Sequence, residues 1–229
     1  MMRIAATSAL MLAACGDQTA QHLAAGLKPC AERELSGALS PASCQLQSSG
    51  QTLRVTYADL AAGTRTGAVS IDVLGEEGQV EQTLLEADVS EYLAPSLQDV
   101  DGDGRADILI PRASGNVNTD YGVWIYDGAR YGRVGEISGV EVERTADGLI
   151  AVPARSSAAS WNVRYYRLDE SGLRHLITAQ IDGQEQLPDG SVRSTCTVSE
   201  APGLADLNLS ERAAEERFCA EPASQVFGP

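Results

Sequence analysis

Five short segments of the chain alternate apolar and polar residues, and this alternation constrains the fold more than any other feature. Side chains of a β-strand point to opposite faces in turn, so a period of two indicates strands with one buried face. The apolar residues of these segments are Leu53, Val55 and Tyr57; Val69, Ile71 and Val73; Val123 and Ile125; Val140 and Val142; and Val163 and Tyr165. Turn-forming clusters separate the segments, as in hairpins and meanders. The pattern predicts an all-β domain of small antiparallel sheets.

One stretch near the C-terminus has a different character. Residues 210–218 read SERAAEERF and are rich in helix-forming residues. Ser210 is a suitable N-cap, and acidic residues in the first turn favour the helix dipole. Pro222 discourages continuation of the helix. We therefore expect a short C-terminal helix beside the β domain.

The segment DVDGDGRAD at residues 99–107 is the strongest chemical motif in the chain. Its spacing suits Ca²⁺, which takes roughly six to eight oxygen ligands. The expected ligands are the side chains of Asp99, Asp101, Asp103 and Asp107 and the backbone carbonyl of Arg105. Mg²⁺ suits the loop less well, because it retains several waters. The sequence predicts a calcium site, and an acidic surface turn without an ion is the alternative.

The residues around this loop argue against an EF-hand. Pro95 lies upstream, where that motif needs a helix, and Ile110 stands where it needs a bidentate glutamate. The following residues 108–111, ILIP, indicate a short buried strand. An aspartate loop that leads directly into a strand resembles the loops of FG-GAP and VCBS-type repeats, which are blade modules of β-propellers.

The N-terminus has the features of a lipoprotein signal. A positive start is followed by an apolar stretch, residues 4–14, that is too short to span a bilayer. The residues LAAC at 12–15 match the bacterial lipoprotein processing box, in which Cys15 is lipidated. An ordinary secretory signal with an accidental cysteine is the alternative. We expect a lipoprotein that faces the periplasm, with the choice between inner and outer membrane left open. The chain then divides into a signal peptide (1–14), a tether (15–27) and a single calcium-binding β domain (28–229).

The remaining cysteines predict disulfides. Of five cysteines, Cys15 is assigned to lipid, which leaves Cys30, Cys44, Cys196 and Cys219. An even number in an exported protein indicates two bridges. Proximity in sequence favours Cys30–Cys44 and Cys196–Cys219, and pairing between the two ends of the chain is the alternative.

Composition and motifs exclude several classes of function. The chain has 17 basic and 32 acidic residues, a net charge of −15. Such a chain does not bind nucleic acid through phosphates, but it attracts cationic partners, including basic proteins. The sequence contains no G-x-S-x-G elbow, P-loop or HExxH motif. We therefore predict a binding protein rather than an enzyme.

A second feature of interest follows the predicted calcium strand. Residues 113–121, ASGNVNTDY, are small, polar and loop-like, and they run into the strand-like residues 123–127, VWIYD. A loop that projects from a rigid strand pair is well placed to bind a partner. A hairpin connection without a partner is the alternative.

Together, the lipoprotein box, the aspartate loop and this polar loop resemble periplasmic lipoproteins of Xanthomonas and relatives, most clearly over residues 97–135. Those proteins are immunity factors for type IV secretion effectors and inhibit lysozyme-like peptidoglycan hydrolases. The resemblance implies a compact, propeller-like β fold with bound Ca²⁺ and an inhibitory loop. In that loop Ser114 and Tyr121 would hydrogen-bond to catalytic carboxylates. The implied loop residues are Ser114, Gly115, Asn116, Asn118, Asp120 and Tyr121.

This chain departs from the family pattern within that loop. Ser114, Gly115 and Tyr121 match in kind, whereas the expected further glycines are replaced. The replacing residues are Asn116, Asn118, Thr119 and Asp120. The predicted function is that of a lipid-anchored immunity protein that inhibits a peptidoglycan hydrolase. The alternative is a calcium-stabilised structural or adhesion module of the envelope without inhibitory activity.

Overall fold

The computed structural model describes residues 26–32, 43–48, 51–57, 66–90, 93–188, 190 and 192–227. Within these ranges the chain is mostly β-strand, and the strands form three antiparallel sheets. This confirms the predicted all-β class with a short helix near the C-terminus. The predicted signal peptide (1–14), the lipidation site Cys15 and nearly all of the tether (15–27) lie outside the described residues.

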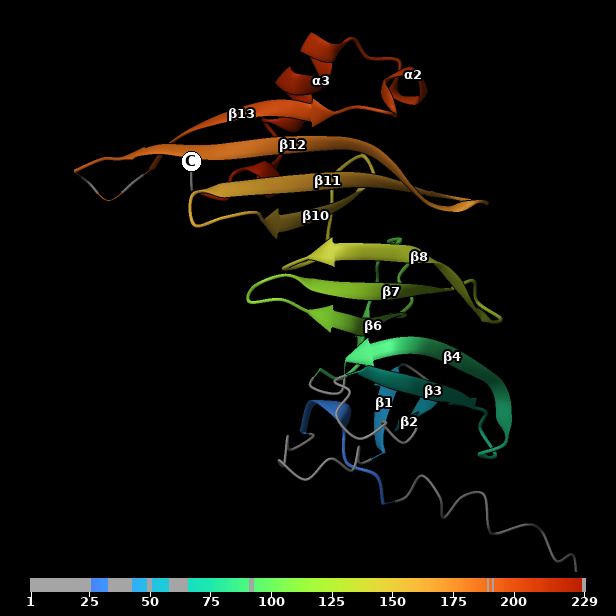
Figure 1. Ribbon diagram of the computed structural model, residues 1–229. Coiled ribbons are helices and arrows are strands. Elements are labelled where there is room, and N and C mark those ends of the chain that lie inside the picture. The colour runs from blue at the N-terminus through green and yellow to red at the C-terminus, as the bar shows by residue number, and fades with distance from the viewer. Residues whose placement is uncertain are drawn as a thin grey trace, which may run out of the picture.

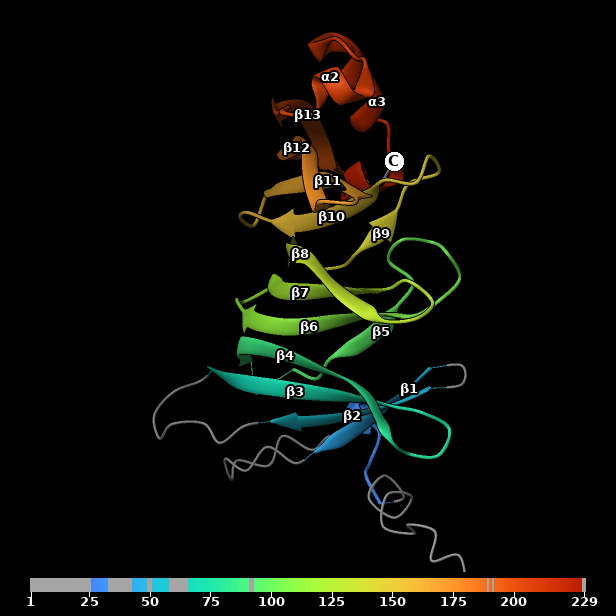
Figure 2. The same cartoon turned by 90° about the vertical axis from the view of Figure 1, so that its right-hand side faces the viewer.

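Each sheet is a meander in which strands consecutive in the chain are neighbours. The N-terminal sheet contains β1 (Cys44–Ser48), β2 (Gln51–Tyr57), β3 (Thr66–Leu74) and β4 (Val80–Ser90). The middle sheet contains β5 (Ser96–Gln98), β6 (Asp107–Ser114), β7 (Thr119–Tyr126) and β8 (Tyr131–Gly139). The C-terminal sheet contains β9 (Glu143–Arg144), β10 (Ile150–Arg155), β11 (Ser160–Asp169), β12 (Gly172–Gln186) and β13 (Val192–Glu200). The sheets follow one another in chain order, with the two C-terminal α-helices beyond the last sheet (Figures 1 and 2).

The middle sheet is buried on both faces, which explains the unbroken apolar run at the start of β6. Ile108 and Ile110 join a core with Ile71 of the N-terminal sheet. Leu109 points to the opposite face and joins a core with Val152 of the C-terminal sheet. Strands covered on both faces lose the alternation that a half-buried strand shows. The three small antiparallel sheets thus pack in series (Figures 1 and 2).

An ion cluster joins the N-terminal sheet to the middle sheet. Glu86 of β4 is 5% exposed, and its carboxylate accepts two 2.9 Å hydrogen bonds from the Arg133 guanidinium and one of 3.0 Å from Trp124 Nε1. Arg112 Nε lies 3.4 Å from the same carboxylate. Gly122 lies directly beneath it, where a Cβ would come within 2.9 Å of the Glu86 carboxyl carbon. One buried carboxylate therefore contacts all three long strands of the middle sheet.

The helical segments lie at the two ends of the molecule. η1 (Cys30–Glu32) lies beside β1 of the N-terminal sheet, whereas α2 (Leu204–Leu207), α3 (Glu211–Phe218) and η2 (Pro222–Ser224) pack with the C-terminal sheet. The predicted N-cap is confirmed, because the Ala213 N–H donates a 3.3 Å hydrogen bond to Ser210 Oγ. Phe218 is fully buried and packs on Tyr165 of β11 with ring centroids 4.6 Å apart. In the described part of the chain no helix has the length and apolar character needed to cross a membrane.

Two disulfides are present, and their pairing is the one favoured by proximity in sequence. Cys30 bonds to Cys44 at the edge of the N-terminal sheet, and Cys196 of β13 bonds to Cys219 at the end of α3. The second bridge holds α3 against the C-terminal sheet, where Phe218 completes the core.

Removal of the second bridge is expected to destabilise the fold. The double variant Cys196→Ser/Cys219→Ser should lose about 2–3 kcal/mol of unfolding free energy, because the unfolded chain regains the freedom that the bridge removes. Urea unfolding measures this loss. The matched variant Cys30→Ser/Cys44→Ser should lose slightly less, since its bridge spans 14 residues rather than 23. An unchanged unfolding midpoint for the first variant would contradict the expectation.

The strand predicted around Val140 and Val142 is wrong. Residues 140–142 form the crossover from β8 to β9. The Val140 N–H donates to the Pro153 carbonyl at 2.8 Å, and Gln98 Nε2 donates to the Val142 carbonyl at 2.6 Å. Val142 is buried between the middle and C-terminal sheets. A crossover between two sheets also has one buried side, so it imitates the alternation of a strand.

Candidate metal loop and binding hairpin

The aspartate loop connects β5 to β6 and brings three of its four carboxylates together. One oxygen each of Asp99, Asp101 and Asp107 lies within 4.8 Å of the others. Asp99 also receives backbone hydrogen bonds from Gly102 (2.6 Å) and Gly104 (3.0 Å), which fold the loop around its side chain. The left-handed φ of 84° at Gly104 fits the expected role of this glycine in a sharp turn.

Asp107 anchors the loop to the core. It is fully buried, and its carboxylate accepts hydrogen bonds from the backbone N–H groups of Val100 (2.8 Å), Tyr126 (2.9 Å) and Asp101 (3.4 Å). Burial, aided by the negative charge of Asp101, raises the pKa of Asp107 to about 6 against the opposing effect of these bonds. The buried carboxylate thus ties the loop to β7 at an electrostatic cost.

The other two predicted ligands lie differently. The Asp103 carboxylate forms an ion pair with the Arg105 guanidinium and accepts a 2.8 Å hydrogen bond from the Arg105 N–H. Both residues are exposed. Asp103 is therefore outside the group of three converging carboxylates, although its position in the sequence is that of a ligand.

The converging side chains suit a hard divalent cation. They offer oxygen donors, which Ca²⁺ prefers. In the described ranges no arginine or lysine forms an ion pair with Asp99, Asp101 or Asp107. The charge of Arg144 acts on Asp101 without forming an ion pair with it, so most of the negative charge of the three carboxylates has no counter-charge, which a bound cation would provide. The side chains of Asp99, Asp101 and Asp107 therefore fit the Ca²⁺ ion that the sequence predicts.

The predicted inhibitory loop is shorter in the structure than in the sequence interpretation. β6 extends to Ser114 and β7 begins at Thr119, so only residues 115–118 form the turn. Asp120 is exposed on β7, whereas Tyr121 is half-buried against the core between the middle and C-terminal sheets. Ser114 and Tyr121, which were expected on one loop, therefore lie on two strands with different exposure.

The turn is held by a neighbouring turn of the C-terminal sheet. The Asn118 side chain accepts a 2.8 Å hydrogen bond from the Arg155 N–H and donates a 2.9 Å bond to the Arg155 carbonyl. The Arg155 guanidinium in turn donates to the carbonyls of Ser157 and Ala158, at 2.9 and 3.0 Å. An asparagine side chain thus pairs with the backbone of the next sheet as a strand residue would.

A groove of about 390 Å³ lies between the two turns. It is lined by residues 115–118 on one side and 155–158 on the other. Ser114, Gly115, Asn116 and Val117 are all exposed, and Val117 is an exposed large apolar side chain at 46%. Sequence reasoning missed the part played by residues 155–158, because no local pattern links them to Asn118, which lies 37 positions earlier.

The comparisons with known proteins assign no family to the chain. No protein-family model and no curated protein sequence matches it. It is similar to the solved structure of a Xanthomonas type IV secretion system related protein, with a TM-score of 0.45 and 10% identity over 72% of this chain and 91% of that chain. The resemblance to FG-GAP and VCBS repeats therefore rests on the loop residues 99–107 alone.

Proposed function

We propose that this protein is a lipid-anchored protein of the bacterial envelope that binds and inhibits a peptidoglycan hydrolase, as an immunity protein does. The proposed contact is the β6–β7 turn together with the neighbouring turn at residues 155–158. The role is binding and occlusion rather than catalysis. Lipid on Cys15 would hold the chain at the membrane with this surface facing the periplasm.

The observation that carries this proposal is an exposed turn of small residues that the fold holds rigidly. Gly115, Asn116 and Val117 project beyond the paired strands, while Asn118 is fixed by its two hydrogen bonds to Arg155. A turn that is already ordered loses little conformational entropy when it enters a cleft. This supports a contact made by the tip of the hairpin, with Tyr121 supporting it from the strand.

We also propose that the aspartate loop binds Ca²⁺ through Asp99, Asp101 and Asp107. The ion would act as a structural counter-charge and would take no part in chemistry. Asp107 accepts a hydrogen bond from the Tyr126 N–H, so the loop is joined to the strand that carries the binding hairpin. Calcium would thus stabilise the support of the hairpin rather than contact the hydrolase.

Enlargement of the turn is expected to abolish inhibition. Gly115→Arg places a long side chain at the tip, where the Cβ would make only an ordinary contact of 3.5 Å with the Asn118 carbonyl. The fold should therefore persist, while the loss of fit at the centre of the contact should weaken inhibition at least about tenfold. Peptidoglycan lysis by a panel of lysozyme-like hydrolases, with the purified protein and Ca²⁺ present, measures the effect.

Gly132→Arg is the matched control. Gly132 is exposed on β8, has open space where a Cβ would lie, and pairs with Ile125 at the end of the hairpin opposite the turn. This variant should inhibit as the unmodified protein does. Absence of inhibition of every hydrolase at micromolar concentration by the folded, calcium-loaded protein would contradict the proposal. That result would favour the alternative of a structural envelope module.

A further inference from the structure

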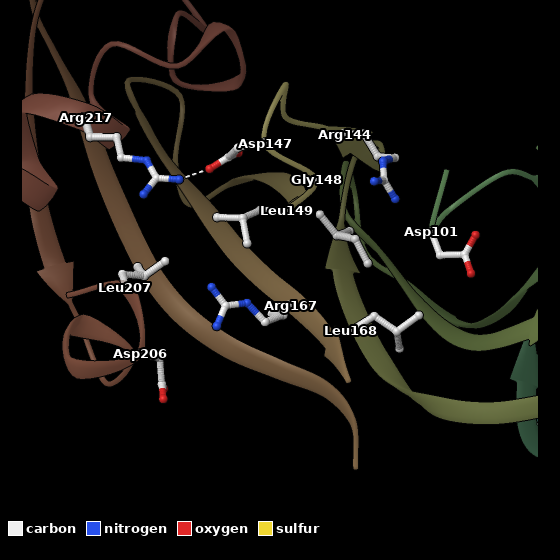
Figure 3. A pocket seen from close by; sticks show the side chains of 11 residues that line it. Asp101, Arg144, Asp147, Gly148, Leu149, Arg167, Leu168, Asp206, Leu207 and Arg217 are labelled. Atoms are coloured by element: carbon white, nitrogen blue, oxygen red, sulfur yellow. Dashed lines mark hydrogen bonds and ion pairs between the residues drawn. The ribbon is translucent and has the colours of Figure 1, made fainter. Parts of the chain in front are cut away.

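A pocket of about 460 Å³ lies at the opposite end of β11 from the binding hairpin. Its walls come from the β9–β10 turn, from β11 and from the helices α2 and α3, and Asp101 of the aspartate loop lies at one end (Figure 3). This volume falls in the range of small-molecule sites, which is roughly 300–1,000 Å³. The Cys196–Cys219 bridge holds α3 in place, so the wall that α3 contributes is fixed.

Two arginines of this pocket, Arg144 and Arg167, form no ion pair with a described residue, but the charge of Arg144 acts on Asp101. Asp147 forms an ion pair with Arg217, and the dashed line in Figure 3 marks it. Asp206 forms an ion pair with Arg174, which comes from outside the pocket. The Arg167 side chain has no hydrogen bond or ion pair with any described residue, although it is only partly exposed. In a chain of net charge −15, Arg167 is a candidate anion receptor, because it is unpaired while Asp147 and Asp206 are neutralised by other arginines.

Apolar side chains lie beside this arginine. Leu149 is 4% exposed, and Leu168 and Leu207 are half-buried. Figure 3 shows the Arg167 guanidinium on the side of the pocket that Leu207 and Asp206 form, with Arg144 at the other end near Asp101. Six of the eleven lining residues are charged, so the leucines form a smaller apolar part of the wall, on which the uncharged end of a ligand can pack.

We infer that this pocket binds a small organic oxyanion, whose charged group pairs with the free Arg167 guanidinium while its apolar body packs on Leu149 and Leu207. A carboxylate and a phosphate ester share this chemistry, because both accept two parallel hydrogen bonds from an arginine fork. The site is separate from the proposed hydrolase contact, so the two proposals succeed or fail independently.

Isothermal titration of the purified full chain tests the inference with four probes. Phenyl phosphate and benzoate carry an oxyanion on an aromatic body, inorganic phosphate has no apolar body, and benzyl alcohol has no charge. We expect phenyl phosphate, benzoate or both to bind with a dissociation constant of about 1 mM or below. The tighter of the two identifies the natural headgroup as phosphate or carboxylate. Benzyl alcohol and inorganic phosphate should bind at least about tenfold more weakly, since each lacks one of the two contacts.

Arg167→Gln should weaken binding of the tighter probe about tenfold, because it removes a charged hydrogen-bond donor. Its melting temperature should stay unchanged, since the side chain has no polar partner to lose. Arg193→Gln is the matched control, because Arg193 is exposed and pairs with Glu185 away from the pocket. The inference is overturned by absence of binding of both aromatic anions, by equal binding of inorganic phosphate, or by equal loss of binding in the two arginine variants.

Discussion

Chelation of calcium is expected to lower the melting temperature of the purified protein by about 10 °C, and added Ca²⁺ is expected to restore it. An ion that binds only the folded loop stabilises the fold by mass action. The gain is about 4 kcal/mol when the ion is present at about a thousand times its dissociation constant. Asp99, Asp101 and Asp107 can receive it because their oxygens already lie within 4.8 Å of one another. Thermal unfolding in EDTA, in Ca²⁺ and in Mg²⁺ measures the effect, and Mg²⁺ should give the smaller shift.

Two aspartate variants distinguish the ligand set predicted from the sequence from the smaller set of carboxylates that converge in the structure. Asp101→Asn removes a converging carboxylate and should abolish the calcium-dependent shift. Asp103→Asn removes a residue that the spacing predicts as a ligand but that the structure pairs with Arg105, so most of the shift should remain. Asp120→Asn serves as the control, because this carboxylate is exposed on β7 outside the loop. Equal loss of the shift in Asp101→Asn and Asp103→Asn would support the ligand set read from the sequence.

A melting temperature that responds to neither EDTA nor Ca²⁺ would contradict the metal proposal. The cost of burying Asp107 would then be offset by its three backbone hydrogen bonds alone. Hydrogen bonds to a charged group contribute about 1.5–3 kcal/mol each at most, so this outcome is physically accessible and the experiment decides between the two accounts.

The features that the sequence predicted well are those decided by neighbouring residues. Alternation identified β2, β3, β7 and β11, since the period of two is a local property of a half-buried strand. The cap at Ser210 is also local, because its oxygen bonds an N–H three residues later. The disulfides followed from proximity along the chain, and each closes a short loop.

β4 shows what local reasoning could not find. Its sequence, VEQTLLEADVS, is rich in residues that favour helices, and Leu84 and Leu85 are adjacent rather than alternating. It is a strand because it pairs with β3 over most of its length, from Leu74 opposite Val80 to Thr66 opposite Ser90. Pairing and packing override weak intrinsic preference in strands. Glu86, the buried carboxylate of this strand, was therefore missed as well.

The hairpin of the candidate site was misjudged for a related reason. Residues 113–114 and 119–121 are small or polar, which is typical of a loop. They are nevertheless strand, because Thr119 pairs with Gly139 and Tyr121 with Ile137 of β8. The backbone hydrogen bonds of a central strand do not depend on apolar side chains. The turn is limited to residues 115–118 by strand pairing with β8 and by the hydrogen bonds of Asn118 to β10. Both partners lie outside the local sequence.

Replacement of Glu86 is expected to destabilise the fold by about 3 kcal/mol, because it removes the buried one of the two carboxylates that Arg112 and Arg133 share between the packed sheets. Glu86→Gln keeps the size of the side chain and removes its charge. The carboxylate that is lost accepts two hydrogen bonds from Arg133 and one from Trp124, and it is 5% exposed. Arg112 and Arg133 are partly exposed. The expected loss of unfolding free energy therefore lies at the low end of the range for broken buried ion pairs. Urea unfolding at neutral pH measures it.

Glu136→Gln is the matched control, since the Glu136 carboxylate pairs with the same two arginines but is 52% exposed. Water and salt screen an exposed pair, so this variant should lose less than about 1 kcal/mol. An equal loss in the two variants would contradict the argument that burial, rather than the number of ion pairs, gives Glu86 its effect.

The pH dependence of the Glu86→Gln effect provides a second test. Burial raises the pKa of Glu86, but the hydrogen bonds from Arg133 and Trp124 and the charges of Arg133 and Arg112 lower it by more, so the folded pKa lies below its usual value. The stabilisation is therefore fully present above about pH 4.3, the ordinary pKa of glutamate. It is lost as the pH falls through the lower folded pKa. The difference in unfolding free energy between the unmodified protein and Glu86→Gln should accordingly be constant near neutral pH and shrink in acid. A difference that grows as the pH falls would show that Glu86 does not hold the two sheets together through its charge.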